Sequence, residues 1–519
     1  MLKFEVYRDG QLDPTFVLRN AYLLGADNVG LRATLQRDGA TIACDKRAAG
    51  PAALSLMFDV GRIGTFSLQT CLLPEREEPY LLSLELARHR LMLVLAKQED
   101  WLMFDLPADH SVTVRANLAR KRFVEALNRA DDPAEADRLA RQSLEAAVDA
   151  SEELALAHAE TMISRRRRAG HLQRGVFGCG VGANHTAEAV RGALQNNFDY
   201  VVLPTPWRQL EPEEQVYDWA LHDGWAEWAR LARVPLLAGP VISLDHRDAP
   251  SWLTVMEHDY ETVRDILYEH VERVVSRYKN VVTVWNVASG LHTNALLNLT
   301  LDQIMDLTRM AVMVTKRVHP SAKVLIEITH PFGEYYAMHQ RSIPPLVYAD
   351  MILQAGIPVE AFGVKLPMGR AANGQYTRDL MQISDLLDRY SNLGKPVHVT
   401  GLGVPSERVP RAIDAGRGVR SGPGSPLDPP DDEAGCWRQP WSVNVQSHWL
   451  EAAYTVVLSK PFVDSVAWLD LIDGDSTPLP KAGLANEQFK AKMAYQRLIS
   501  MRRQFQKQEA ARGARGNGR

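Results

Sequence analysis

From residue 175 to about residue 472, short apolar runs alternate with longer segments in which apolar residues recur every three or four positions. The short runs are apolar at nearly every position, which is typical of strands buried on both faces. They read GVFGCGV, DYVVLPT, VPLLAGPVI, VVTVWNVA, AKVLIEIT, EAFGVKL, PVHVTGL and VDSVAWLDL, and segments with helical periodicity such as 260–278, 301–317, 377–392 and 444–459 lie between them. This alternation predicts an α/β fold, a (β/α)8 TIM barrel. A doubly wound sheet is the alternative, although no glycine-rich phosphate turn follows a strand.

The first 169 residues follow other patterns. Residues 1–112 contain short alternating apolar and polar runs between Gly, Asp and Pro, which predict a β-sandwich whose later strands include YLLSLEL and LMLVLAK. Over residues 113–169, Ala, Leu, Glu and Arg recur at helical spacing with one break at Asp131–Pro133, which predicts a helical hairpin. We therefore expect a sandwich, a hairpin linker, a barrel over 170–505 and a disordered tail over 506–519.

Composition narrows the class of protein. The 519 residues are 46% hydrophobic and 24% charged, with a net charge of −4, so neither nucleic-acid binding nor a polyanionic tail is indicated. No apolar run is long enough to span a membrane, and the N-terminus lacks the pattern of a signal peptide. The 4 cysteines form no CxxC pair and suit free thiols in a reducing compartment, so we expect a cytoplasmic protein.

Five short motifs follow the predicted strands in order. They are Trp207 with Glu211-Pro212, His246 with Ala249–Trp252, WNVASG over 285–290, PVHVTGLGV over 396–404, and Trp468 with Asp473. Together they resemble glycoside hydrolase family 10, the endo-β-1,4-xylanase family, over about residues 170–500. The resemblance implies a TIM barrel with a carbohydrate ligand at the carboxyl ends of its strands. It also suggests that the N-terminal sandwich is similar to a carbohydrate-binding module.

The same resemblance implies that the catalytic groups of the family are missing. The family's acid/base glutamate closes the segment that resembles WNVASG, where this chain has Gly290, and its nucleophile falls at Gly401. A retaining glycosidase needs two carboxyl groups about 5 Å apart, one to protonate the leaving oxygen and one to attack the anomeric carbon. Glycine supplies neither group. We therefore expect xylanase activity to be absent or negligible.

Other carboxyl groups stand near predicted strand ends. Glu327 falls at the end of the fifth strand, and Asp470 and Asp473 follow the eighth, so a relocated catalytic pair is one interpretation. The alternative is that these carboxylates pair with arginines or cap helices. We expect no metal and no cofactor, since the chain has no HxH, HExxH or EF-hand pattern.

Tryptophans are the other candidate ligand contacts. Aromatic rings stack on the apolar faces of sugars, and the candidates near strand ends are Trp207, Trp252, Trp285 and Trp468, with His246 as a hydrogen-bonding neighbour. The alternative is that Trp285 and Trp468 plug the barrel mouth. Three functions stay open: a catalytically degenerate barrel that binds carbohydrate, an active hydrolase with relocated carboxylates, and a non-catalytic scaffold whose mouth is closed by the Pro- and Gly-rich segment 403–440. The oligomeric state is not indicated.

Overall fold

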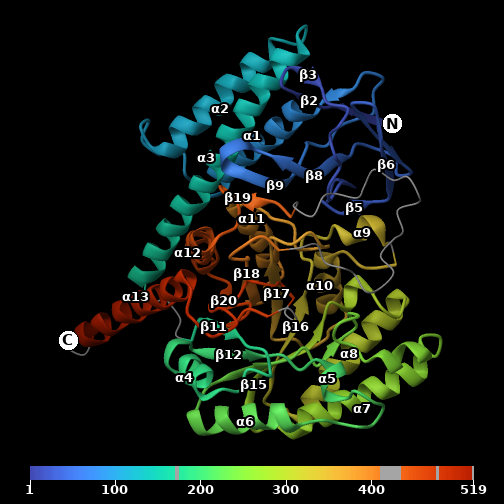
Figure 1. Cartoon of the computed structure of the whole chain (residues 1–519), viewed down its shortest axis with the longest axis vertical. Helices are drawn as coiled ribbons and strands as arrows, with labels where there is room; N and C mark the ends of the chain where they lie inside the picture. Colours follow the sequence, from blue (N-terminus) through green and yellow to red (C-terminus); the bar gives the residue numbers. More distant parts are fainter. Residues whose placement is uncertain (170–174, 340, 410–433, 475–477, 517–519) are drawn as a thin grey trace.

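The computed structural model describes residues 1–169, 175–339, 341–409, 434–474 and 478–516. Its C-terminal part is a closed barrel of eight parallel strands (Figure 1). The strands are β11 (Phe177–Gly180), β12 (Tyr200–Leu203), β13 (Leu236–Ala238), β15 (Val282–Ser289), β16 (Lys323–Ile328), β17 (Ala361–Pro367), β18 (Val397–Gly403) and β20 (Val463–Trp468). The ring closes because β13 pairs with both β12 and β15. The predicted (β/α)8 TIM barrel is confirmed.

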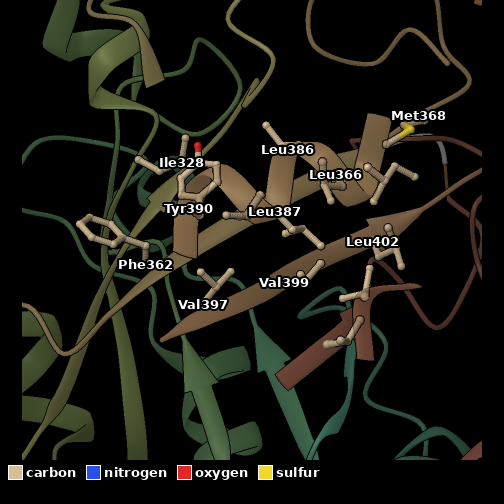
Figure 2. Close-up of a cluster of buried hydrophobic side chains, with 14 of the residues drawn as sticks. Ile328, Phe362, Leu366, Met368, Leu386, Leu387, Tyr390, Val397, Val399 and Leu402 are labelled. Atoms are coloured by element: carbon tan, nitrogen blue, oxygen red, sulfur yellow. The ribbon is translucent and has the colours of Figure 1, made fainter. Parts of the chain in front are cut away.

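Helices surround the barrel and cover the outward face of its strands (Figure 1). The longer ones are α4 (Glu188–Asn197), α6 (Ala220–Ala232), α7 (Tyr260–Tyr278), α8 (Leu301–Val318), α10 (Pro345–Gln354), α11 (Leu380–Ser391), α12 (Val443–Ser459) and α13 (Met493–Gly516). Figure 2 shows this packing for α11, whose Leu387 and Tyr390 lie against Phe362 of β17 and Val397 of β18. A separate, smaller cluster fills the interior of the barrel: Tyr200, Leu237, Leu325, Ala361 and Ala467. Alternate residues of each strand therefore pack into two separate cores, one inside the barrel and one between the strands and the surrounding helices.

Two sheets form most of the N-terminal part. One has the order β10-β1-β7-β6, and the other has the order β19-β9-β8-β4-β5. Their strands are β1 (Leu2–Glu5), β4 (Tyr22–Leu24), β5 (Gly30–Leu31), β6 (Ala33–Asp38), β7 (Thr41–Lys46), β8 (Ala53–Asp59), β9 (Gly64–Gln69), β10 (Tyr80–Leu81) and β19 (Cys436–Trp437). The last of these belongs to the barrel's strand-seven connection, so the second sheet is completed by residues more than 350 positions away in sequence.

Two expectations for the chain's secondary structure were wrong. The runs YLLSLEL and LMLVLAK lie almost entirely in a helix, α1 (Leu82–Asp100), whose Leu82, Leu86, Arg90 and Val94 are buried at a spacing of four. The helix packs on α3 (Pro133–Ala169), where Leu91 joins a cluster with Ala146 and Ala147, and α3 is paired with α2 (Ser111–Leu127). Residues 506–516, expected to be disordered, continue α13, while 517–519 lie outside the described residues. None of the described helices combines the length and apolarity needed to cross a bilayer.

The N-terminal part docks on the barrel near the loops that follow strands five to seven (Figure 1). A buried ion pair joins them: Arg90 Nη2 of α1 lies 2.6 Å from Oδ2 of Asp379, the N-cap of α11. On α3, Glu152 accepts hydrogen bonds from Trp437 Nε1 at 2.8 Å and from the Leu380 amide at 3.1 Å. Because these groups satisfy one another away from water, the two parts form one continuous packed unit.

Candidate functional site

The carboxyl ends of β15 and β18 bring Gly290 and Gly401 to the same end of the barrel. Gly290 directly follows β15, and Gly401 lies in β18, where it pairs with Lys365 of β17. The residues preceding the two glycines meet at one carboxylate. Ser289 Oγ donates to Glu327 Oε1 at 2.6 Å, and Thr400 Oγ1 donates to Glu327 Oε2 at 2.5 Å. The end of β16 thus links the two positions, as expected for neighbouring strands of a barrel mouth.

Little space exists for a side chain at either glycine. A Cβ on Gly401 would lie 2.8 Å from Leu469 Cδ1 and 3.4 Å from Lys365 Cγ. Gly290 has φ +65°, a left-handed conformation that costs most residues roughly 1–2 kcal/mol, and its Cβ would lie 2.7 Å from Thr329 Oγ1. Both positions are therefore unsuited to a glutamate without movement of the neighbouring residues.

Glu327 is the centre of what we call the Glu327 cluster: Ser289, Glu327, Lys365 and Thr400. Glu327 is 3% exposed, and besides the two hydroxyl donors it faces Lys365 Nζ at 3.8 Å. Both carboxylate oxygens of Glu327 therefore accept a hydrogen bond from a hydroxyl group, and one of them also lies near an ammonium group. The Lys365 side chain keeps 25% of its surface exposed, so it is the member of the cluster that solvent or a ligand reaches most easily.

The two aspartates after β20 have different environments. Asp470 is buried, its Oδ2 has no hydrogen-bond partner among the described residues, and burial raises its pKa to about 7, opposed by Lys365 and assisted by Asp473. Asp473 Oδ1 instead accepts from the Gly483 amide at 2.8 Å and from Lys492 Nζ at 2.7 Å. Asp473 thus stabilises its own loop by accepting hydrogen bonds. Asp470, near the Glu327 cluster, has one carboxylate oxygen that accepts no hydrogen bond from the described residues.

The loop after strand three supplies further polar groups. Asp248 Oδ2 accepts from Ser243 Oγ at 2.8 Å, and burial together with Asp245 raises the Asp248 pKa. Lys365 acts in the opposite direction on that pKa, which places Asp248 within its electrostatic reach. His246 has an exposed side chain pointing to solvent rather than a buried one among these groups.

Trp207 and Trp252 lie together beside the barrel mouth. Trp207 is 1% exposed, donates from Nε1 to Glu211 Oε2 at 2.6 Å, and stacks on the His270 ring at 4.5 Å. Trp252 meets Trp207 edge-on at 5.6 Å and donates to the Glu211 carbonyl at 3.2 Å, while part of its ring stays exposed. Of this pair, only Trp252 has a face available to a ligand.

Trp285 and Trp468 are both 0% exposed. Their neighbours Val284 and Ala467 face the barrel interior, so the period of two along a strand directs both indoles outward toward the helices. Trp285 Nε1 donates to His319 Nδ1 at 3.2 Å, and Trp468 Nε1 donates to the Ala482 carbonyl at 2.7 Å. Neither ring faces the mouth, so neither has a surface on which a sugar stacks.

Sequence reasoning did not assign a role to Lys365 or Thr400. The signal was present in the alternation along β17, where Ala361 faces inward and places Gly363 and Lys365 on the same inward face. Among the described residues, no group of three or more His, Cys, Asp or Glu side chains has an arrangement that would hold a metal ion.

The barrel part of the chain is similar to known proteins. The model of the family "Glycosyl hydrolase family 10" matches residues 170–501. Endo-1,4-beta-xylanase 2 of Aureobasidium pullulans is 22% identical over 231 residues, which is 41% of this chain and 61% of that protein. Endo-1,4-beta-xylanase B of Neocallimastix patriciarum is 22% identical over 167 residues, covering 31% of this chain and 18% of that protein. The chain thus spans less than two thirds of the length of these curated relatives.

Solved structures of xylanases are also similar. Native xylanase 10B from Thermotoga maritima has a TM-score of 0.47 at 16% identity, covering 66% of this chain and 99% of that one. Xylanase 10B from Thermotoga petrophila RKU-1, solved in complex with xylobiose, has a TM-score of 0.46 at 16% identity, covering 66% and 97%.

Proposed function

The chain belongs to glycosyl hydrolase family 10, and we propose that its barrel binds a carbohydrate without cleaving it by the family's two-carboxylate mechanism. The supporting observation is the geometry at Gly290 and Gly401. Neither position carries a carboxyl group, and Leu469 stands where a side chain at 401 would project. Because double displacement needs an acid and a nucleophile on opposite sides of the glycosidic bond, this arrangement does not supply its chemistry.

Ligand binding is supported by the polar groups that stay at the mouth. Lys365 is partly exposed, Asp470 has an oxygen without a partner among the described residues, and Asp248 is half-buried within electrostatic reach of Lys365. Ammonium and carboxyl groups of this kind donate to and accept from sugar hydroxyls. Trp252 adds a partly exposed ring on which a pyranose face stacks.

Calorimetric titration with xylo- and cello-oligosaccharides, run beside a reducing-sugar assay on the same preparation, tests the proposal. We expect binding without product release. Lys365→Met should weaken binding about 10- to 150-fold, since a hydrogen bond to a charged group contributes roughly 1.5–3 kcal/mol. Lys323→Met is the matched control, because Lys323 is an exposed lysine that begins β16 at the opposite end of the barrel. Absence of binding to every oligosaccharide would contradict the proposal.

A hydrolase with relocated carboxylates is the second candidate, and one observation favours it. Burial raises the pKa of Asp470 to about 7, which suits a general acid at neutral pH. Glu327, which accepts from two hydroxyls and lies 3.8 Å from Lys365 Nζ, is a second carboxyl group at the same end of the barrel. Sugar release that both Glu327→Gln and Asp470→Asn abolish, with oligosaccharide binding retained, would favour this candidate. No release from the unmodified protein would exclude it.

A further inference from the structure

A concave site lies between the N-terminal part and the side of the barrel. It has a volume of about 730 Å³, within the range of small-molecule pockets. Its walls come from the turn joining β4 to β5, the end of β9, α1, the loop after β16, α10 and α11. No member of the Glu327 cluster lines it, so this interdomain cleft is separate from the barrel mouth.

The wall of the cleft contains a buried arginine with poor hydrogen bonds. The Arg378 side chain is 5% exposed. Its contacts with Ser67 O, Tyr22 Oη and Glu334 Oε2 are all 3.4 Å long, and its Nε has no hydrogen-bond partner among the described residues. A guanidinium group has five N–H donors, and its hydrogen bonds are strongest near 2.8 Å. Arg378 therefore has donor capacity that the protein itself leaves weakly used.

Glu334, the carboxylate that forms an ion pair with Arg378, does not line the cleft, and three polar groups that do line it have other partners. Gln69 Nε2 donates to Asn28 Oδ1 at 3.1 Å and lies 3.1 Å from His89 Nε2. Burial lowers the pKa of His89 to about 4, so its ring is neutral at pH 7. Asp385 is held by Arg389 and by Lys97 at 2.8 and 2.9 Å.

The two further carboxylates of the cleft, Asp27 and Asp350, are exposed at its rim. Water screens such exposed charges, so they act weakly on a group bound deep inside.

The rim of the cleft is apolar as well as exposed. Leu72, Met92 and Val347 line it with 42%, 58% and 43% of their surfaces open to solvent. They come from three separate elements: the β9–β10 connection, α1 and α10. Exposed apolar side chains that converge on one pocket are typical of a ligand site rather than of scattered surface residues.

We propose that this cleft binds a small amphipathic carboxylate. The carboxylate group accepts hydrogen bonds from Arg378, and the hydrocarbon body lies against Leu72, Met92 and Val347. Each part of such a molecule fits one feature of the cleft. Its small size fits the volume, its carboxylate fits the weakly hydrogen-bonded Arg378, and its hydrocarbon part fits the apolar rim. The inference does not rest on carbohydrate binding at the mouth, because the two sites share no residue named for either.

The test compares three probes of equal chain length: octanoate, octanamide and octylamine. Binding is measured by calorimetry on the full chain at pH 7. We expect octanoate to bind, octanamide to bind at least about tenfold more weakly because it lacks the charge, and octylamine not to bind. Octanoate should also raise the thermal unfolding midpoint, since a ligand of the folded state stabilises it.

Two matched variants locate the site without disturbing the buried arginine. Met92 and Leu95 are both on α1 and both 58% exposed, but only Met92 lines the cleft. Met92→Glu should weaken octanoate binding about tenfold or more, whereas Leu95→Glu should leave it unchanged. Equal binding of the three probes, no binding of octanoate, or equal effects of the two variants would each overturn the proposal.

Discussion

Leu469 occupies the space beside Gly401 into which a side chain at that position would extend, with its Cδ1 2.8 Å from the place of a Cβ. Leu469 is itself buried with Leu479 and Ala482 in a small apolar cluster of the strand-eight loop. Apolar packing from the next strand's loop therefore fills the space beside Gly401. A carboxylate introduced at position 401 would displace that packing.

The first prediction concerns the introduction of a glutamate at position 401. Gly401→Glu should lower the free energy of unfolding by about 1–3 kcal/mol because it overpacks the cluster around Leu469. The double variant Gly290→Glu, Gly401→Glu should lose more, since position 290 has φ +65°, and should release no sugar from xylan. Urea unfolding and a reducing-sugar assay measure both effects. Gly192→Glu is the control, because Gly192 lies in α4 with no atom within 4 Å of its Cβ position. Xylan hydrolysis by the double variant would refute the prediction.

The second prediction concerns Glu327. Glu327→Ala should lower the free energy of unfolding by about 1–3 kcal/mol, because Ser289 and Thr400 lose their buried acceptor. Glu327→Gln should cost less, since its side-chain carbonyl still accepts one of the two bonds. Chemical denaturation of both variants measures the difference. Equal stability of Glu327→Ala and the unmodified protein would show that the cluster contributes nothing to folding.

The third prediction is a pH dependence that originates at Asp470. Burial raises its pKa to about 7 in the folded protein, above the value of roughly 3.9 for an unfolded aspartate. Between about pH 4 and pH 7 the folded state binds a proton that the unfolded state has released, so the contribution of Asp470 to stability falls as pH rises through this window. Asp470→Asn should remove this dependence. Unfolding midpoints measured from pH 4 to 8 test it, with Asp302→Asn, an exposed carboxyl on α8, as control.

The fourth prediction concerns the ion pair between the two parts of the chain. Arg90→Met should lower the free energy of unfolding by about 3–5 kcal/mol, because Asp379 is 0% exposed and would lose its only ion-pair partner of opposite charge among the described residues. Arg138→Met is the matched control, since its pair with Glu135 is on the surface, where water screens the two charges and the pair contributes little to stability. Similar losses of stability in the two variants would contradict the prediction, because they would mean that the buried Arg90–Asp379 pair contributes no more to stability than the exposed pair.

The barrel was predictable because its strands are buried on both faces and its helices are amphipathic. Both patterns can be recognised in short stretches of the sequence, without knowledge of the tertiary contacts. The apolar stretch that became α1 was not, because LSLELARHRLMLVLAK suits a strand or a helix equally and is decided by the α3 face against which it packs. Gly290 and Gly401 were expected at one end of the barrel because each belongs to a recognisable motif at the end of a predicted strand, and the structure has Gly290 directly after β15 and Gly401 near the end of β18.

By itself the sequence determined the (β/α)8 architecture, the strand ends at which polar residues gather, and the absence of carboxyl groups at positions 290 and 401. The tertiary structure alone decided which side chains meet. Ser289, Glu327 and Thr400 converge because β15, β16, β17 and β18 are neighbours with a particular register, and register is a property of paired strands rather than of any one of them. Side chains alternate between the two faces of a strand, so adjacent residues point one to the barrel interior and the next to the surrounding helices. For this reason Trp285 and Trp468 point away from the mouth.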